Sequence, residues 1–503
     1  MSFAPRLEKS LLLLSVCVQG AILIALGVAA AAPPGPVSRL VILSLAACVP
    51  YAAAILLMSR MRLPGSAAWA VLATAFVLRV VLVQFPPVFS DDIYRYLWDG
   101  RVILSGENPY AHAPAAPELA ALRDRAWTLI NYKELRTPYP PLAELLFALV
   151  ALVSRSVSAF KLVAAALDTL VVALVLFLAG GRLRAQPAKP DPASHRAIVA
   201  AAAYGLNPLA CVETGMSGHF EPVATALALA GLLLLKRGRA AVSSALFAAG
   251  FGVKLAPGLL WPVAARKNVR ALLVFPVLAA AFYLPFLSVG SKTVEMVDTY
   301  ARRWEGNAGL FAIVKAGFER LIGVVAGVRG DGEMIHLRFL DEPAAALQGT
   351  FFSLHKDGAF DAAAPGAFAL GDLSLVAAKL TLALLVIALV ATLVARRAEP
   401  IRASAWILGA LVVVTPVLHP WYLLWILPLA AVLGQFPWFV LAALAPLAYL
   451  PLDAWWAFGR WDMPAWIPWV EHGAFAVSIA AMVALRSRAA RGERTVDPCL
   501  RSK

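Results

Sequence analysis

Charged residues are scarce in this chain of 503 residues, where they account for 15% of the positions. Hydrophobic residues account for 61%, whereas soluble domains contain roughly 45–50% apolar and roughly 25% charged residues. A composition so poor in charge argues against a soluble domain. We therefore expect a polytopic membrane protein.

Cysteine is rare as well. Cys17, Cys48 and Cys211 lie in apolar stretches and Cys499 lies in a basic tail, with no close spacing among the four. A disulfide or zinc framework is not expected, and the three cysteines in apolar stretches are interpreted as buried small hydrophobes. The chain also has no P-loop, no dinucleotide-binding glycine fingerprint and no His-Glu-x-x-His motif. These absences argue against a cytosolic nucleotide-binding fold.

Acidic residues are outnumbered by basic ones, 30 to 44, which leaves a net charge of +14. The excess does not form a phosphate-binding stripe, because the basic residues lie in short segments between apolar runs. That distribution is typical of the cytoplasmic loops of membrane proteins, and no nucleic-acid partner is expected. The segments are Arg60/Arg62, Lys236–Arg239, Arg266/Lys267, Arg396/Arg397 and the tail from Arg486.

Apolar runs fill most of the chain and predict about 12–14 transmembrane helices. We see no internal repeat, and we interpret the first run as an uncleaved signal anchor. The expected organisation is one integral membrane domain over 1–503, with an external catalytic loop at 86–139, a second external loop at 289–374 and a cytoplasmic basic tail at 486–503. The apolar runs lie near 10–31, 38–58, 66–85, 159–180, 197–213, 220–235, 240–265, 270–288, 375–395, 402–418, 421–434, 437–452 and 468–485.

The basic segments also set the orientation. With Arg6 and Lys9 inside, the third apolar run delivers Asp91 and Asp92 to the outer side. The run at 140–154 is only about 15 residues, roughly 22 Å of helix against a core of about 30 Å, so it is expected to be re-entrant or juxtamembrane.

The run at 240–265 is interpreted as two half-helices that break around Lys254 and Pro257, because a lysine in mid-span is costly unless it reaches a polar cavity. With both adjustments every basic segment returns to the cytoplasm. The polar residues that gather on the outer side are Asp91, Asp92, His219, Glu221, Lys254 and His419.

The stretch Ser90–Tyr110 is the most informative part of the chain, because it places paired acids directly after an apolar run. Asp91 and Asp92 are candidates for a general base or a metal ligand. The alternative is a helix cap with an ion pair to Arg95. Asp99 is expected to form a salt bridge with Arg95 or Arg101.

Two further candidates lie at the ends of apolar runs. Tyr139 opens the short helix and is expected either to hydrogen-bond a substrate or to anchor the chain at the interface. His219 and Glu221, two positions apart, are interpreted as contacts for an acceptor hydroxyl. Two candidate ligands make a weak metal site, so no metal is expected.

Lys254 and His419 are candidates for binding a phosphate. Lys254 supplies a point charge, and the alternative is that it snorkels to the interface. His419 can hold a phosphate oxygen as a cation or as a neutral donor. Tyr422 follows it, and with Trp421 and Trp425 it suits a contact zone for lipid or sugar.

Six short motifs, taken in their order along the chain, resemble those of the glycosyltransferase-C superfamily. They are Ser-Asp-Asp-Ile-Tyr-Arg-Tyr, Gly-Glu-Asn-Pro-Tyr, Tyr-Pro-Pro-Leu, Gly-His-Phe-Glu-Pro, Lys-Leu-Ala-Pro and His-Pro-Trp-Tyr, and they span about residues 66 to 450. Within the superfamily the chain looks most like the bacterial polyprenol-phosphate-mannose-dependent α-mannosyltransferases, relatives of the GPI mannosyltransferases. The resemblance implies an all-α polytopic glycosyltransferase-C fold, with juxtamembrane helices in the first large external loop.

The resemblance also implies roles for residues. The catalytic aspartate of the family falls on Asp92, with Asp91 as a second acid where relatives have one at the position of Ser90. Donor-phosphate contacts fall on Lys254 and His419, with Arg95 as a further candidate. Substrate contacts are assigned to Tyr139, His219, Glu221 and Tyr422.

The mechanism implied is an inverting sugar transfer, most simply of mannose, from a polyprenyl-phosphate donor to a lipid or glycan acceptor. It would take place on the extracytoplasmic face of a bacterial plasma membrane, with Asp92 as base and with no cofactor. Two alternatives remain. A lipid-linked saccharide transporter or flippase would be expected to show inverted repeats. An O-antigen ligase or polymerase would use arginine and histidine in a large external loop, and the segment 289–374 contains Arg302, Arg303, His336, Arg338 and His355.

Overall fold

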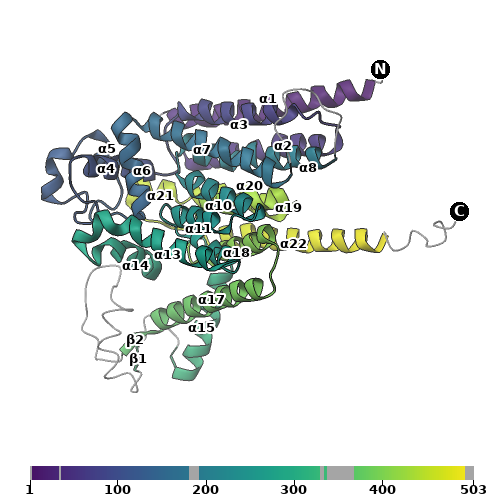
Figure 1. Cartoon of the computed structure of the whole chain (residues 1–503). Helices are drawn as coiled ribbons and strands as arrows, with labels where there is room; N and C mark the ends of the chain where they lie inside the picture. The colour runs from purple at the N-terminus through teal and green to yellow at the C-terminus, as the bar shows by residue number, and fades with distance from the viewer. Residues whose placement is uncertain (1–2, 33–34, 181–191, 329–333, 337–366, 493–503) are drawn as a thin grey trace.

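The computed structural model describes residues 3–32, 35–180, 192–328, 334–336 and 367–492. Over these residues the chain is helical, apart from one antiparallel pair of strands, β1 (Met334–His336) and β2 (Ala367–Ala369). Most helices run roughly alongside one another, whereas α15 (Leu310–Ala326) and α17 (Leu370–Ala395) protrude at the lower edge in Figure 1.

Among the described residues, seven helices are long and apolar enough to cross a membrane, or up to eight if the pair Pro192–Gly205 and Pro208–Met216, bent by 55°, is counted as one span. Shorter apolar helices account for several of the other expected runs. The expected all-α polytopic fold is confirmed. The seven long helices are Arg6–Ala31, Val37–Arg60, Val157–Leu178, Val269–Val289, Leu370–Ala395, Pro437–Phe458 and Trp466–Arg488, and the shorter ones are Ala67–Val83, Pro141–Val153, Ala240–Phe251, Ala256–Ala265 and Pro400–Val414.

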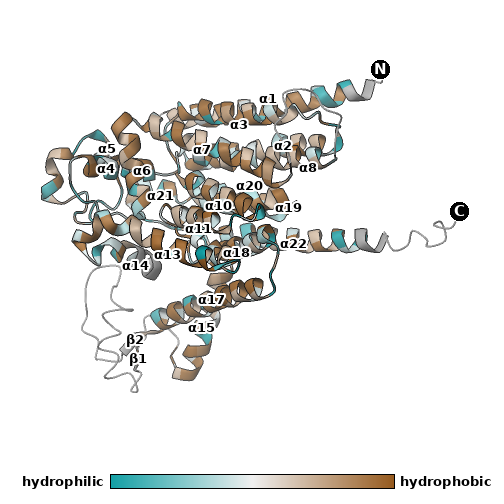
Figure 2. Cartoon of the chain, viewed as in Figure 1, coloured by the Kyte–Doolittle hydropathy of each residue, from teal (hydrophilic) through white to brown (hydrophobic). Residues whose placement is uncertain are grey.

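Hydrophobic side chains cover the outside of the molecule as well as its core. Figure 2 shows α17 to be hydrophobic along most of its length, and its Leu384 is 64% exposed. Cys17 was expected to be buried but is exposed. An apolar exterior of this extent suits contact with lipid, so an apolar residue on a spanning helix need not face the core.

A buried ion pair ties the N-terminal helices together. Arg79 Nη2 lies 2.6 Å from Asp168 Oδ2, and both side chains are fully buried. Tyr204 donates to the same carboxylate, and Arg79 Nη1 donates to the carbonyl oxygens of Ala75 and Gly205 at 2.8 Å. These hydrogen bonds offset part of the desolvation cost of burying the ion pair. The helices of this half are α1 (Phe3–Ala31), α2 (Val37–Arg60), α3 (Ala67–Val83), α7 (Val157–Leu178) and α8 (Pro192–Gly205).

The segment 86–153 folds into short helices at one end of the molecule (Figure 1). Two of them, α4 and α6, pack closely. The glycine at position 100 permits this approach, since a Cβ atom there would lie 2.5 Å from the carbonyl oxygen of Phe147. The α6 helix is too short to span, as expected for the run at 140–154. The helices are α4 (Asp92–Leu104), η1 (Pro117–Leu122), α5 (Arg125–Thr128) and α6 (Pro141–Val153).

Two breaks in the helical structure bring polar residues together. One is the π-helical turn η2 (Val212–Met216), which follows α9 (Pro208–Cys211) and precedes α10 (Glu221–Lys236). The other lies at Lys254, between α11 (Ala240–Phe251) and η3 (Ala256–Leu260). The second break confirms the interpretation of 240–265 as two half-helices.

The C-terminal half completes the bundle. The run at 421–434, expected to be one span, is instead a 3₁₀ segment followed by a helix of only 7 residues that begins at Leu427, with Pro428 in its first turn. Its elements are α12 (Trp261–Ala265), α13 (Val269–Tyr283), η4 (Leu284–Val289), α14 (Lys292–Arg303), α18 (Pro400–Val414), η7 (Pro420–Trp425), α19 (Leu427–Leu433), α20 (Pro437–Leu444), η8 (Ala445–Tyr449), α21 (Leu452–Phe458) and α22 (Trp466–Gly492).

Candidate active site

The paired acids lie at the start of α4, and neither side chain caps the helix. The Asp91 side chain makes no cap hydrogen bond; its Oδ1 accepts from Asn131 Nδ2 at 2.7 Å. The Asp92 backbone N–H donates to Ser90 Oγ at 3.3 Å. The Asp92 carboxylate is 26% exposed. The capping interpretation is therefore wrong for Asp91, and Asp92 remains open to an incoming group.

His219 lies next to Asp92. Its Nε2 is 3.8 Å from Asp92 Oδ2 and 3.1 Å from Ser90 Oγ. On the opposite side of the ring, Nδ1 is 3.0 Å from Glu213 Oε2, and both of these side chains are fully buried. Tyr449 Oη donates to Glu213 Oε1 at 2.6 Å. The histidine thus lies between two carboxylates, one buried and one partly open.

Lys254 does not snorkel away from the site. Its ammonium lies 2.8 Å from Glu221 Oε1, where the glutamate is fully buried, and 5.2 Å from the centre of the Tyr139 ring. Tyr139 is only 8% exposed, and its ring packs edge-on against Tyr96 at 5.1 Å. Tyr139 shapes the wall beside the lysine.

Aromatic stacking joins His419 to the same cluster. The imidazole of His419 stacks on Trp421 with centroids 4.4 Å apart, and Trp421 also stacks on His219 at 4.1 Å. Tyr422 contacts His419 edge-on at 5.2 Å and stacks on Trp425 at 4.4 Å. The two histidines are therefore linked through one indole, as far as ring contacts among the described residues show.

Arg95 is largely engaged within its own helix. Its Nε lies 2.9 Å from both oxygens of Asp99, which confirms that expected salt bridge, and its Nη1 donates to the carbonyl oxygen of Leu135 at 3.0 Å. Arg101 instead pairs with Asp124. A phosphate contact by Arg95 stays a prediction.

Burial and neighbouring charges separate the protonation of these groups. Burial, reinforced by Asp92, raises the pKa of Asp91 to about 7. Burial also raises the pKa of Asp92, against the lowering effect of His219 and Lys254. For His219, burial favours the neutral form, but the adjacent Glu213 outweighs it and the pKa is raised. Burial lowers the pKa of His419 to about 3, so this imidazole is neutral.

Sequence reasoning missed Glu213 and Tyr449. Both lie inside stretches that read as apolar runs, and 236 positions separate them. The sequence signal that could have identified Glu213 was its charge, because a carboxylate within an apolar run is costly and is retained for a partner or for chemistry.

Gly306, in the segment 289–374, reaches the site through its backbone. The Gly306 N–H donates to the Pro416 carbonyl and the Leu418 N–H donates to the Gly306 carbonyl, both at 3.0 Å. This pairing ends directly before His419. Arg338 and His355 lie outside the described residues, and nothing is described of the side chains of Arg302, Arg303 and His336.

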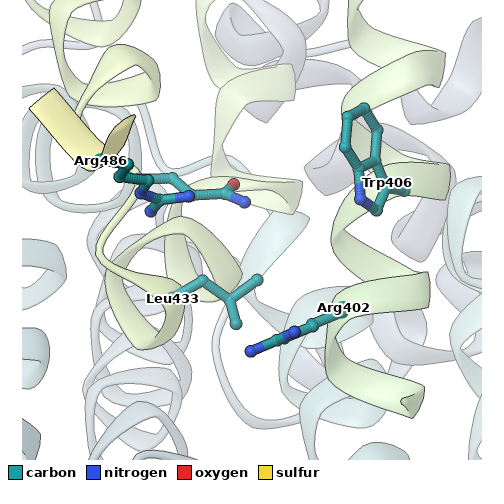
Figure 3. A pocket seen from close by; sticks show the side chains of 5 residues that line it. Arg402, Trp406, Leu433 and Arg486 are labelled. Carbon is teal, nitrogen blue, oxygen red and sulfur yellow. The ribbon is translucent and has the colours of Figure 1, made fainter. Parts of the chain in front are cut away.

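A separate cavity of about 340 Å³ is lined by Arg402, Trp406, Leu433, Gln435 and Arg486, none of which belongs to the group around Asp92. Figure 3 shows Arg402 and Trp406 on one side of it, facing Arg486 across Leu433. It adds no residue to the candidate site. Within the described residues, no three His, Cys, Asp or Glu side chains are grouped so as to hold a metal ion, and metal independence stays a prediction.

Comparisons with known proteins cover most of the chain. Residues 16–270 match the model of the family described as alpha-(1->6)-mannopyranosyltransferase, N-terminal domain, and residues 367–450 match the model described as MptB C-terminal domain. The chain is also similar to alpha-(1->6)-mannopyranosyltransferase A of Mycobacterium tuberculosis. The two are 26% identical over 452 residues, which is 85% of this chain and 77% of the relative.

Proposed function

The chain belongs to the alpha-(1->6)-mannopyranosyltransferase family and is therefore a membrane mannosyltransferase, and from that premise we propose that it transfers mannose from a polyprenyl-phosphate donor to a lipid or glycan acceptor. The observation that carries this proposal is the partly open Asp92 carboxylate, with a histidine, a lysine and a second histidine gathered beside it. The name of the mycobacterial relative suggests an α-(1→6) linkage, so the acceptor would present a primary 6-hydroxyl group.

Asp92 acts as the general base. It takes the proton of the acceptor hydroxyl, whose oxygen attacks the anomeric carbon of the donor. The bond from that carbon to the phosphate oxygen breaks, and the electron pair leaves with the polyprenyl phosphate. Attack from the face opposite the phosphate inverts the anomeric configuration. Proton transfer by a positioned group contributes typically about 10²–10⁴-fold to the rate.

Lys254 and His419 stabilise the leaving phosphate. A lysine ammonium has three donors, and Lys254 lies in an ion pair with Glu221 at 2.8 Å. His419 contributes as a neutral N–H donor, since its lowered pKa excludes a charged form at neutral pH. Donors fixed in place before the reaction stabilise developing charge without reorganising. Arg95 adds positive potential close by, because its charge also acts on Asp92.

Asp91 and the remaining residues position the substrates. Asp91 holds Asn131 and so orders the chain over the start of α4. His219 and Glu221 line the acceptor side of Asp92, while Tyr139 and Tyr422 supply apolar surface for a sugar ring. These roles are proposed from their places around Asp92.

We further propose that the site faces away from the cytoplasm. Support comes from the two ends of the molecule: α4 and α5 lie at one end, whereas α22 runs toward the opposite end (Figure 1). Arg60 lies in the last turn of α2 and Lys236 in the last turn of α10. Basic residues concentrate in cytoplasmic loops.

Membranes that contain the protein provide the test. Supplied with radiolabelled polyprenyl-phosphate-mannose, they should transfer label to endogenous lipids or glycans, and Asp92→Asn membranes with equal protein content should not. Labelled GDP-mannose, given where polyprenyl-phosphate-mannose synthesis is blocked, should label nothing. Transfer directly from GDP-mannose would exclude the proposed donor.

A further inference from the structure

Glu213 is a fully buried carboxylate at a break in the bundle. A buried charge is costly unless it is paired and hydrogen-bonded, and Glu213 meets both conditions. Its Oε2 lies 3.0 Å from His219 Nδ1, and its Oε1 accepts from Tyr449 Oη at 2.6 Å. The glutamate touches neither Asp92 nor the open part of the site among the contacts described, so its influence must pass through the histidine.

The backbone fixes Glu213 and His219 relative to each other. The His219 N–H donates to the Glu213 carbonyl oxygen at 2.9 Å, so the two residues are joined twice, through main chain and side chain. The π-helical turn at Val212–Met216 makes this possible, and π-turns of this kind are frequent at functional sites.

The loop between the turn and α10 is pressed against the start of α4. Gly218 has φ +77°, and a Cβ atom there would lie 2.5 Å from Ile93 Cδ1 and 2.9 Å from Lys161 Cγ. Ile93 directly follows Asp92 in the chain. The loop therefore has no freedom to carry His219 away from Asp92.

We propose that Glu213 is a positioning residue for the transfer reaction: it holds His219 as an imidazolium whose Nε2–H faces Ser90 and Asp92, and thereby keeps Asp92 ionised and ready to accept a proton. This inference rests on the proposed function, in which Asp92 is the base. Glu213 itself contacts no reacting atom.

The charges around His219 favour its protonated form. Glu213 on η2, Asp92 on α4 and Glu221 on α10 all act on it and raise its pKa. His419, stacked on the shared indole, is neutral. Besides His219, the cations that act on Asp92 are Lys254, whose charge is offset by Glu221 at 2.8 Å, and Arg95.

The sign of the expected effect follows from the geometry. Replacing Glu213 by Gln removes the far anion and leaves His219 neutral, so the near cation, 3.8 Å from Asp92, is lost as well. The loss of the His219 cation outweighs the loss of the more distant Glu213 anion, so the pKa of Asp92 rises. A charge at this distance shifts a carboxyl pKa by about 1–3 units. The acid limb of the activity profile should therefore move to higher pH by about one pH unit, which is a tenfold loss of kcat/KM on the acid side.

The experiment measures kcat/KM for mannosyl transfer against pH, with full-length protein in membranes. Glu213→Gln should move the acid limb upward. Tyr449→Phe should move it in the same direction by less, because Glu213 keeps its charge. The matched control is Glu471→Gln, the same change at another fully buried glutamate, which accepts from Asn307 Nδ2 at 2.8 Å; it should leave the limb in place.

An unchanged or lowered acid limb in Glu213→Gln would overturn the inference. If that variant does not accumulate, Glu213→Asp keeps the charge and should hold the limb near its wild-type position at reduced kcat; a limb shifted as far as in His219→Gln would refute the role. Asp92→Asn separates the two proposals. If it remains active, the proposed base is wrong; if it is inactive while Glu213→Gln keeps the wild-type profile, only the positioning role fails.

Discussion

The pair of Lys254 and Glu221 offers a sharp test, because the lysine has both a structural and a functional role. Lys254→Met removes the cation that lies 2.8 Å from the fully buried Glu221 carboxylate. Breaking a buried pair from one side typically costs about 3–5 kcal/mol. Lys254 is itself 16% exposed, so the lower end, about 3 kcal/mol, is expected. A loss of activity in this variant alone would therefore have two explanations.

The double variant Lys254→Met/Glu221→Gln separates them. Glutamine keeps the volume of the glutamate without its charge, so most of the lost stability should return. The donor phosphate would still lack its ammonium contact. Truncating a charged hydrogen bond costs about 1.5–3 kcal/mol, which corresponds to a loss of about 10- to 100-fold in kcat/KM for the donor.

Thermal unfolding of the purified variants gives the stability, and transfer at several donor concentrations gives kcat/KM. Glu221→Gln alone should leave the lysine available and lower donor use less than either lysine variant. If the double variant recovers both the unfolding temperature and wild-type transfer, Lys254 serves only to neutralise Glu221. The phosphate site would then have to be assigned to other cations.

Three further outcomes are expected. Asp92→Asn should lower transfer by about 10²-fold or more and Asp91→Asn by much less at equal protein content; equal modest losses would contradict Asp92 as base. The pKa of the Asp91 carboxyl is raised to about 7 in the folded protein, from about 3.9 in the unfolded chain, so the folded protein binds this proton more tightly. The wild type should therefore lose stability from about pH 4 to pH 7, and Asp91→Asn should lose less. Unfolding measured at pH 5 and pH 8 tests this. A cysteine at Asn108 should react with an impermeant reagent on intact cells and one at Arg397 should not; the reverse pattern would place the site in the cytoplasm.

Several features of the site could be predicted from the sequence because the signals were local. A lysine and a proline inside one apolar run predicted the break at Lys254, and the structure has it between α11 and η3. The polar residues after successive apolar runs were expected on one side, and Asp92, His219 and Lys254 do gather in one cluster. The family match also agrees with the motif order.

The pairing of these residues could not be predicted, because it depends on contacts between distant segments. Lys254 was assigned to a phosphate with no protein partner, whereas the fold places a buried acid beside it. Tyr449 reaches Glu213 only because η8 and η2 meet in space. The span at 421–434 was expected from hydropathy alone, and hydropathy does not register Pro428, which lies where a new helix begins within the run.

The pairing of Gly306 with the residues before His419 has a mechanical consequence. Two backbone hydrogen bonds, from the Gly306 N–H to the Pro416 carbonyl and from the Leu418 N–H to the Gly306 carbonyl, fasten the segment around Gly306 to the stretch that carries His419. If residues 304–307 move, residues 416–418 must move with them or these two hydrogen bonds must break. The amide hydrogens of Gly306 and Leu418 should therefore become open to exchange with solvent in one common event, which also frees the stretch before His419.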